Sequence, residues 1–172
     1  MILAPLALLV VQQEDPELER LIRLTYALYV GADAMPRPAI PLTPRLAATE
    51  AECARLRKRI GRPAAHKCGG NRDVLCQCTN PYDFAWTKIG VTVRYLDPTT
   101  AQAVIDIPPP RTEVPDGKPD VAWLFVRNDG QWAIADFGEY GRVPASYRDR
   151  LVSDIQAMRG QLKLPTWRYA GP

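Results

Sequence analysis

The chain has few of the side chains from which nucleophilic active sites are built. It contains one histidine, His66, and two serines, Ser146 and Ser153, which argues against a Ser-His-Asp triad. Glycine-rich phosphate loops and internal repeats are also missing from the sequence. With 22 Lys and Arg against 19 Asp and Glu, neither sign of charge dominates. We therefore expect no nucleic acid as a partner.

No apolar run is long enough to span a bilayer, which takes about 20 residues as a helix. The longest run, Ile2–Val11, carries no charge and is followed by the polar residues Gln12–Asp15. This pattern is typical of a signal-peptide core, although no Lys or Arg precedes it and no small-x-small cleavage site follows it. The alternative is a first buried strand or helix. We interpret residues 1–13 as a signal peptide and expect a periplasmic or secreted protein without a membrane span.

Four cysteines lie close together in the sequence: Cys53, Cys68, Cys76 and Cys78. In an exported protein such thiols oxidise to disulfides. Of the three possible connectivities, the one that joins Cys76 to Cys78 is the most strained, and we favour Cys68 with Cys76 and Cys53 with Cys78. The alternative is zinc, with His66, Cys68, Cys76 and Cys78 supplying ligands. Because paired Cys-x-x-Cys motifs are missing, we expect neither a metal nor another cofactor.

Two amphipathic helices are predicted in the first third of the chain. Asp15-Pro16-Glu17 supplies an N-cap, a proline for the first helical position and an acid at the positive helix end, and apolar residues recur to about Val30. Thr43-Pro44 repeats the start signal, and apolar side chains then step by three and four to Ile60, before Gly61. The same stepping places Cys53 on the buried side of the second helix.

After Phe84 the hydrophobic period changes from helical spacing to strict alternation, which is typical of strands. Turns at Asp97-Pro98-Thr99 and Asn128-Asp129-Gly130 connect two predicted hairpins, 89–96 with 101–107 and 121–127 with 131–137. Ser146 begins a last helix, whose apolar stripe ends at Gly160. The predicted fold class is α+β, with N-terminal helices packed on a four-stranded antiparallel meander and a C-terminal helix. We expect one domain over residues 14–160 and a C-terminal tail over residues 161–172.

The turn of the second hairpin decides which side chains share a face of the sheet. A two-residue turn at Asp129-Gly130 places three pairs opposite each other on one aromatic side: Arg127 and Trp132, Phe125 and Ile134, Trp123 and Asp136. The other side then carries Leu124, Val126, Ala133, Ala135 and Phe137. A three-residue turn with a bulge would change these pairings. The aromatic side is the natural seat for the helices.

The order of the elements resembles a known group of proteins. With Asn80-Pro81-Tyr82-Asp83-Phe84 ahead of the sheet and Asp129-Gly130-Gln131-Trp132-Ala133-Ile134-Ala135-Asp136 in the last hairpin, residues 14–159 look like small exported bacterial proteins of unknown function with a nuclear-transport-factor-2-like cone. The resemblance implies a strongly curved sheet around a conical pocket. It implies no activity, because relatives of that fold include isomerases, dehydratases, binding modules and adaptor domains. The cysteine-rich loop departs from the general pattern.

Four residues are candidates for a pocket inside such a cone. Asp136 would lie among Trp123 and Trp132, where burial raises the pKa of a carboxyl and suits it to act as a general base. Tyr26 and Tyr29, three apart on the first helix, would supply hydroxyl groups to the same pocket. The alternatives are that Asp136 hydrogen-bonds a helix end or points at solvent, and that the tyrosines belong to the core.

A basic cluster near the end of the second helix is a further candidate for binding: Arg55, Arg57, Lys58, Arg59 and Arg62. It would suit an anionic lipid headgroup, nucleic acid or an acidic partner such as a toxin, as in an exported immunity protein. The alternative is the solvated face of an amphipathic helix.

Three hypotheses about function follow. The one we favour is an exported, disulfide-stabilised binding or interaction domain with a small-molecule or protein partner. The second is an enzyme of the isomerase or dehydratase type with Asp136 as its base. The third is a zinc-stabilised cytosolic domain.

Overall fold

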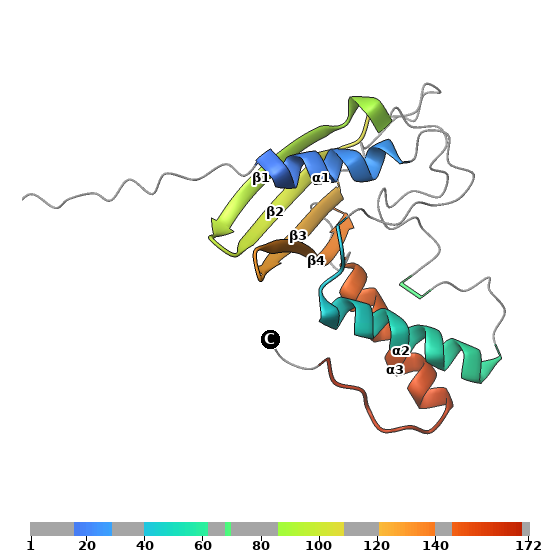
Figure 1. Cartoon of the computed structure of the whole chain (residues 1–172). Helices are drawn as coiled ribbons and strands as arrows, with labels where there is room; N and C mark the ends of the chain where they lie inside the picture. The colour runs from blue at the N-terminus through green and yellow to red at the C-terminus, as the bar shows by residue number, and fades with distance from the viewer. Residues whose placement is uncertain are drawn as a thin grey trace, which may run out of the picture.

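The structure is a computed structural model and describes residues 16–28, 40–61, 68–69, 86–108, 121–139 and 146–169. Its elements are, in chain order, helix α1 (Pro16–Ala27), helix α2 (Pro44–Ile60), the 3-10 helix η2 (Trp86–Lys88), strands β1 (Gly90–Asp97), β2 (Thr100–Asp106), β3 (Val121–Asn128) and β4 (Gln131–Glu139), and helix α3 (Tyr147–Gln161) (Figure 1). Several predictions lie outside the described residues: the signal peptide at 1–13, Tyr29, Arg62, His66, Cys76, Cys78 and the segment 80–84.

The fold class is α+β, as predicted, with a C-terminal helix. The four strands form one antiparallel sheet in the order β1-β2-β3-β4. Both predicted hairpins are confirmed. In the second, Asp129 and Gly130 have φ angles of 50° and 80°, the paired positive values of a two-residue turn whose twist matches that of the strands. Among the described residues no helix has the length and apolar character needed to cross a membrane.

A β-bulge in the second hairpin corrects one part of the prediction. Phe125 pairs with Ile134 as expected, but the register shifts after this pair because Ala135 is an extra residue in β4. An extra residue reverses the alternation beyond it, so Trp123 pairs with Phe137 instead of Asp136. The prediction that Asp136 shares a face with Trp123 was wrong. Phe137, expected on the other side, lies with its ring centroid 6.4 Å from that of Trp123.

Helix α1 packs on the aromatic side of the sheet (Figure 1), as predicted. Its buried residues follow helical spacing: Leu18, Ile22, Thr25 and Tyr26. Between this helix and the sheet lies a core of inward side chains from all four strands, among them Ile105, Val121, Trp123 and Phe125. Helix α1 ends at Ala27, three residues before the predicted end.

Helices α2 and α3 both begin beside β4 and pack against each other (Figure 1). The backbone of Leu42, just before α2, bridges to Ile134, and Ser146, just before α3, bridges to Gly138. The predicted bounds of α2 are confirmed, since the Thr43 hydroxyl caps its first turn and Gly61 ends it with a φ of 70°. Helix α3 buries the predicted stripe but ends at Gln161, one residue beyond Gly160.

Candidate functional site

Tyr26 and Trp123, two of the residues expected to line a pocket, are packed into the core. The ring of Tyr26 lies between those of Trp86 and Trp123, with both centroid distances 5.7 Å. Trp123 also contacts Phe125, at 5.7 Å. Tyr26, Trp123 and Phe125 have no exposed surface, and Trp86 has 5%. The structure therefore brings Tyr26 and Trp123 together as predicted, but as parts of a filled aromatic cluster.

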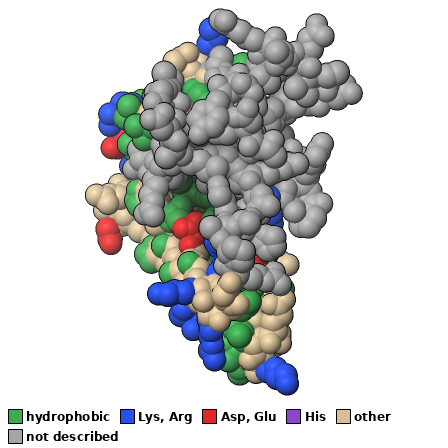
Figure 2. All heavy atoms as spheres, turned by 90° about the vertical axis from the view of Figure 1, so that its right-hand side faces the viewer, with side chains coloured by type: hydrophobic (Ala, Val, Ile, Leu, Met, Phe, Trp, Pro, Cys, Tyr) green, Lys and Arg blue, Asp and Glu red, His purple; other side chains and the backbone are tan. Residues whose placement is uncertain are grey.

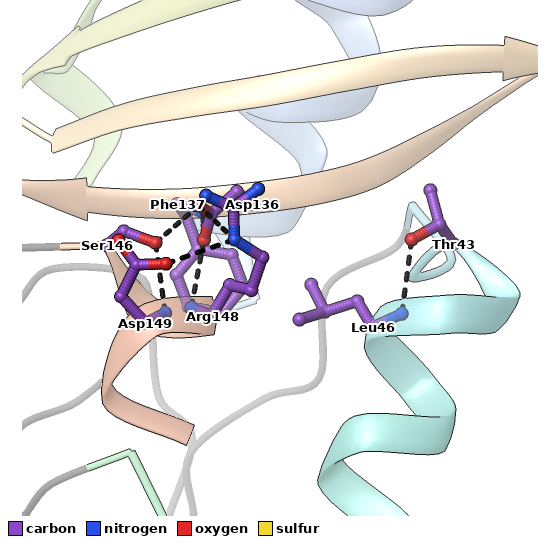
Figure 3. A network of polar contacts seen from close by, with 7 residues as sticks. All are labelled: Thr43, Leu46, Asp136, Phe137, Ser146, Arg148 and Asp149. Atoms are coloured by element: carbon purple, nitrogen blue, oxygen red, sulfur yellow. Dashed lines mark hydrogen bonds and ion pairs between the residues drawn. The ribbon is translucent and has the colours of Figure 1, made fainter. Parts of the chain in front are cut away.

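Asp136 lies at the junction of β4 and α3 instead of among the tryptophans. The residue as a whole is 8% exposed. Oδ1 accepts hydrogen bonds from the backbone amides of Phe137 (2.9 Å) and Arg148 (3.0 Å), and Oδ2 accepts one from the Ser146 hydroxyl (2.5 Å) (Figure 3). The alternative expectation, that Asp136 hydrogen-bonds a helix end, is thus confirmed. The bulge at Ala135 is the physical reason, because it turns the carboxylate toward α3.

The side chains around Asp136 complete a helix cap. The Ser146 hydroxyl, which donates to Asp136, also accepts a hydrogen bond from the Asp149 amide at 3.2 Å. The Nε atom of Arg148 lies 3.8 Å from Oδ2 of Asp136 and donates to Asp149 at 3.2 Å (Figure 3). Three hydrogen bonds and a nearby guanidinium therefore occupy the carboxylate of Asp136. Proton abstraction by this group would require breaking the contacts that join α3 to the sheet.

The disulfide in the described part of the chain joins Cys53 to Cys68, with their Cα atoms 6.0 Å apart. The predicted partners, Cys78 for Cys53 and Cys76 for Cys68, were therefore wrong. Ring strain disfavours only the pairing of Cys76 with Cys78. It does not depend on the path of the chain after α2, which decides the partner of Cys53. Residue 68 returns to the middle of that helix, where Cys53 is buried as its spacing predicted.

The residues around this disulfide form a second buried polar cluster. The Tyr147 hydroxyl donates a hydrogen bond of 2.6 Å to Oε1 of Glu50. Burial of the phenol, together with this hydrogen bond and the charge of Glu50, raises the pKa of Tyr147 far above its usual value. Gly69 lies against the ring of Tyr147, and its amide donates to Asp154. These contacts fix residues 68 and 69 on both helices, and none of them leaves a reactive group exposed.

The basic cluster is part of a larger basic surface than the sequence suggested. Residues 44–61 carry five basic and two acidic side chains, and residues 146–169 carry the same numbers, so this helix pair has an excess of six positive charges in a chain whose net charge is +3. In the lower part of Figure 2, where the far ends of α2 and α3 lie, Lys and Arg are visible and Asp and Glu are not. Sequence reasoning missed the contribution of α3 because its cations are spread among apolar positions about 100 residues later.

Glu52 neutralises part of this surface. It accepts two hydrogen bonds from Arg55, at 2.7 and 2.9 Å, and one from Arg159 at 2.8 Å. The hydrogen bond from Arg55 lowers the pKa of Glu52 below its usual value. Desolvation opposes this shift, and the charge of Arg55 and the contact with Arg159 add to it. In contrast, Arg57, Lys58 and Arg59 have no ion pair with any residue that the structure describes.

Neither a metal centre nor a relative identifies the protein. No group of three or more His, Cys, Asp or Glu side chains that could hold a metal ion occurs in the described ranges, and His66, Cys76 and Cys78 lie outside them. Comparisons of the chain with protein-family models, with curated proteins and with solved structures found no match. The function has to be argued from the surface and the core of this chain alone.

Proposed function

We propose that the protein is an exported interaction domain, periplasmic or secreted, that recognises another protein through its outer surface. In this proposal the sheet is the curved sheet of a nuclear-transport-factor-2-like cone, and the interior serves stability. The bond between Cys53 and Cys68 supports an oxidising compartment, where disulfides persist. The apolar run before residue 12 supports export.

The observation that carries the proposal is the filled aromatic cluster. A ligand site needs a concave pocket with a few polar groups directed into it. Here the ring of Tyr26 stacks on Trp86 and packs at a tilt on Trp123, so two of the pocket candidates, Tyr26 and Trp123, contact each other. The enzyme hypothesis also loses its proposed base, because Asp136 caps α3. Both observations support recognition by the outer surface.

Site-specific photo-crosslinking in the producing cells tests the proposal. A benzophenone amino acid is placed at one exposed position on each of α1, α2, β1 and α3: Leu24, Ala54, Thr92 and Ala157. We expect a covalent adduct with a second protein in the exported fraction from at least one of the four positions. The matched control is the same amino acid at the buried position Phe125, which should give none. Absence of an adduct from all four surface positions would contradict an interaction domain.

A further inference from the structure

The last turn of α2 and the first residues after α3 carry four cations that have no ion pair in the described part of the chain. Both helices start at β4 and run side by side away from the sheet, so their C-terminal ends lie at the same far end of the molecule (Figure 1). The last turn of α2 carries Arg57, Lys58 and Arg59, and Lys163 follows the end of α3. We call these four residues the distal basic tip. Lys58, Arg59 and Lys163 are exposed, and Arg57 is half-buried.

Helix stabilisation accounts for only part of this charge. A cation near a helix C-terminus is favourable, because the end of the helix carries about half a negative charge. Two helix ends therefore offset about one positive charge. Glu52 is already engaged by Arg55 and Arg159, and the four tip residues have no ion pair in the described part of the chain. The tip consequently keeps a positive field that reaches solvent.

We propose that the distal basic tip is the docking site for an acidic protein surface; this inference rests on the proposed function of the domain and assigns its partner a chemistry. The surroundings of the tip favour a protein over a membrane. Binding to a bilayer surface combines cations with apolar side chains that enter the acyl region. The exposed large apolar side chains of the described residues are Leu24, Leu28 and Leu96, all outside the helix pair.

The same surroundings favour a protein over nucleic acid. A nucleic-acid site neutralises a row of phosphates along a stripe or groove, commonly 6 to 10 of them. The tip has four cations without an ion pair in the described part of the chain, three of them consecutive on α2, and the acidic Glu52 lies five residues before Arg57. A compact cationic group matches a patch of Asp and Glu on a folded partner. Such a pairing governs the association rate and its salt dependence.

A binding measurement with a labelled poly-L-glutamate peptide tests the inference on the intact, oxidised protein. The tip variant is R57Q/K58Q/R59Q, and the matched control is R20Q/K88Q/R94Q. The control removes the same charge from exposed cations on α1, η2 and β1 that also have no ion pair in the described part of the chain. Glutamine keeps the helical propensity of the replaced residues. Circular dichroism and thiol counting show that each variant is folded and oxidised.

We expect fluorescence anisotropy to show salt-sensitive binding of the peptide that falls about tenfold or more in the tip variant and less than about twofold in the control. Equal losses in the two variants would mean that net charge alone acts, which would overturn the inference. Binding to phosphatidylglycerol vesicles or to duplex DNA, with none to poly-L-glutamate, would also overturn it. The crosslinking experiment in cells is interpreted separately. A crosslinked adduct without peptide binding would contradict this inference alone. Tip-dependent peptide binding without any adduct would contradict the proposed function alone.

Discussion

The backbone amide of Gly69 donates a hydrogen bond to Oδ2 of Asp154, with the two atoms 2.8 Å apart. Asp154 lies in the middle of α3. Cys68, the residue before Gly69, is bonded to Cys53 in the middle of α2. Two consecutive residues therefore contact both helices of the pair. This contact holds α2 and α3 together from outside the interface in which their apolar side chains meet.

Replacement of Gly69 by alanine is expected to lower the free energy of unfolding by more than about 2 kcal/mol, because two costs add. The φ angle of Gly69 is 79°, and a β-carbon there would lie 2.2 Å from Cε2 of Tyr147. Gly61 is the matched control: its φ angle is 70°, but a β-carbon would meet nothing within 4 Å. G61A should therefore cost only about 1 kcal/mol. Urea unfolding measures both, and equal losses would contradict the packing of Gly69 on Tyr147.

The disulfide is expected to contribute about 3 kcal/mol, the value for a closed loop of 15 residues. Removing both sulfurs in C53A/C68A should lower the urea midpoint accordingly, with a further loss because Cys53 is fully buried. Reduction of the wild-type protein separates the two terms, since it breaks the bond and keeps the sulfur atoms. Peptide mapping under non-reducing conditions should recover Cys53 linked to Cys68. Recovery of Cys53 linked to Cys78 would contradict the structure.

Asp136 is expected to act on stability through the cap of α3. D136N removes the charge that accepts from Ser146 and from the Arg148 amide, and should cost about 2 kcal/mol. S146A should cost more than T43A, because Ser146 caps its helix and also donates to Asp136, whereas Thr43 only caps α2. The double variant D136N/S146A should lose less than the sum of the single losses, as shared contacts require. Additive losses in chemical denaturation would mean that the two residues act separately.

The sequence predicted the elements well where local chemistry decides them. Thr43 and Gly61 mark the ends of α2 because capping depends on neighbours in the chain, and the turn at Asp129-Gly130 requires the positive φ angles those residues tolerate. The bulge at Ala135 has no comparable local signal. One extra residue there moved Asp136 from the aromatic face to the start of α3 and removed the proposed base. Sites depend on such single-residue shifts more than folds do.

Contacts between residues far apart in the chain were the second kind of feature that could not be predicted from the sequence. The basic cluster on α2 was visible as a run of letters, but its continuation by Lys163 needed the parallel packing of two helices about 100 residues apart. The pairing of Cys53 with Cys68 likewise depends on the path of the chain after α2. The contact of the residues after α3 with that helix is also long-range: the backbone of Trp167 hydrogen-bonds both ends of the Gln156 amide.

The segment after α3 is expected to stabilise the fold. A chain ending at Leu162 loses the two hydrogen bonds between Trp167 and Gln156, and also that from Arg159 to the Pro165 carbonyl. It also loses Tyr169, over whose ring the Arg45 guanidinium lies at 3.7 Å. The loss should be about 2 kcal/mol or more in urea unfolding. Y169A removes the cation–π contacts of Arg45 and Arg148 and the ring contact with Trp167 but keeps these hydrogen bonds, and should cost about 1 kcal/mol. Unchanged stability of the truncated chain would contradict the docking.

Glu52 is expected to make the helix pair sensitive to acid. The hydrogen bond from Arg55 lowers the pKa of Glu52 in the folded protein; Arg159 adds to this effect and desolvation opposes it. The contribution of Glu52 to the free energy of unfolding is therefore full above the pKa of an unfolded glutamate, about 4.3. That contribution is lost as the pH falls through the lowered pKa of the folded state. E52Q should therefore be less stable than wild type by about 1 to 2 kcal/mol at neutral pH, and the difference should vanish in acid. The control is E19Q, whose exposed pair with Arg23 should change stability by less than about 0.5 kcal/mol. Urea unfolding at neutral pH and at successively lower pH, continued well below about 4.3, measures the difference. A constant gap between E52Q and wild type would show that protonation of Glu52 is not coupled to folding.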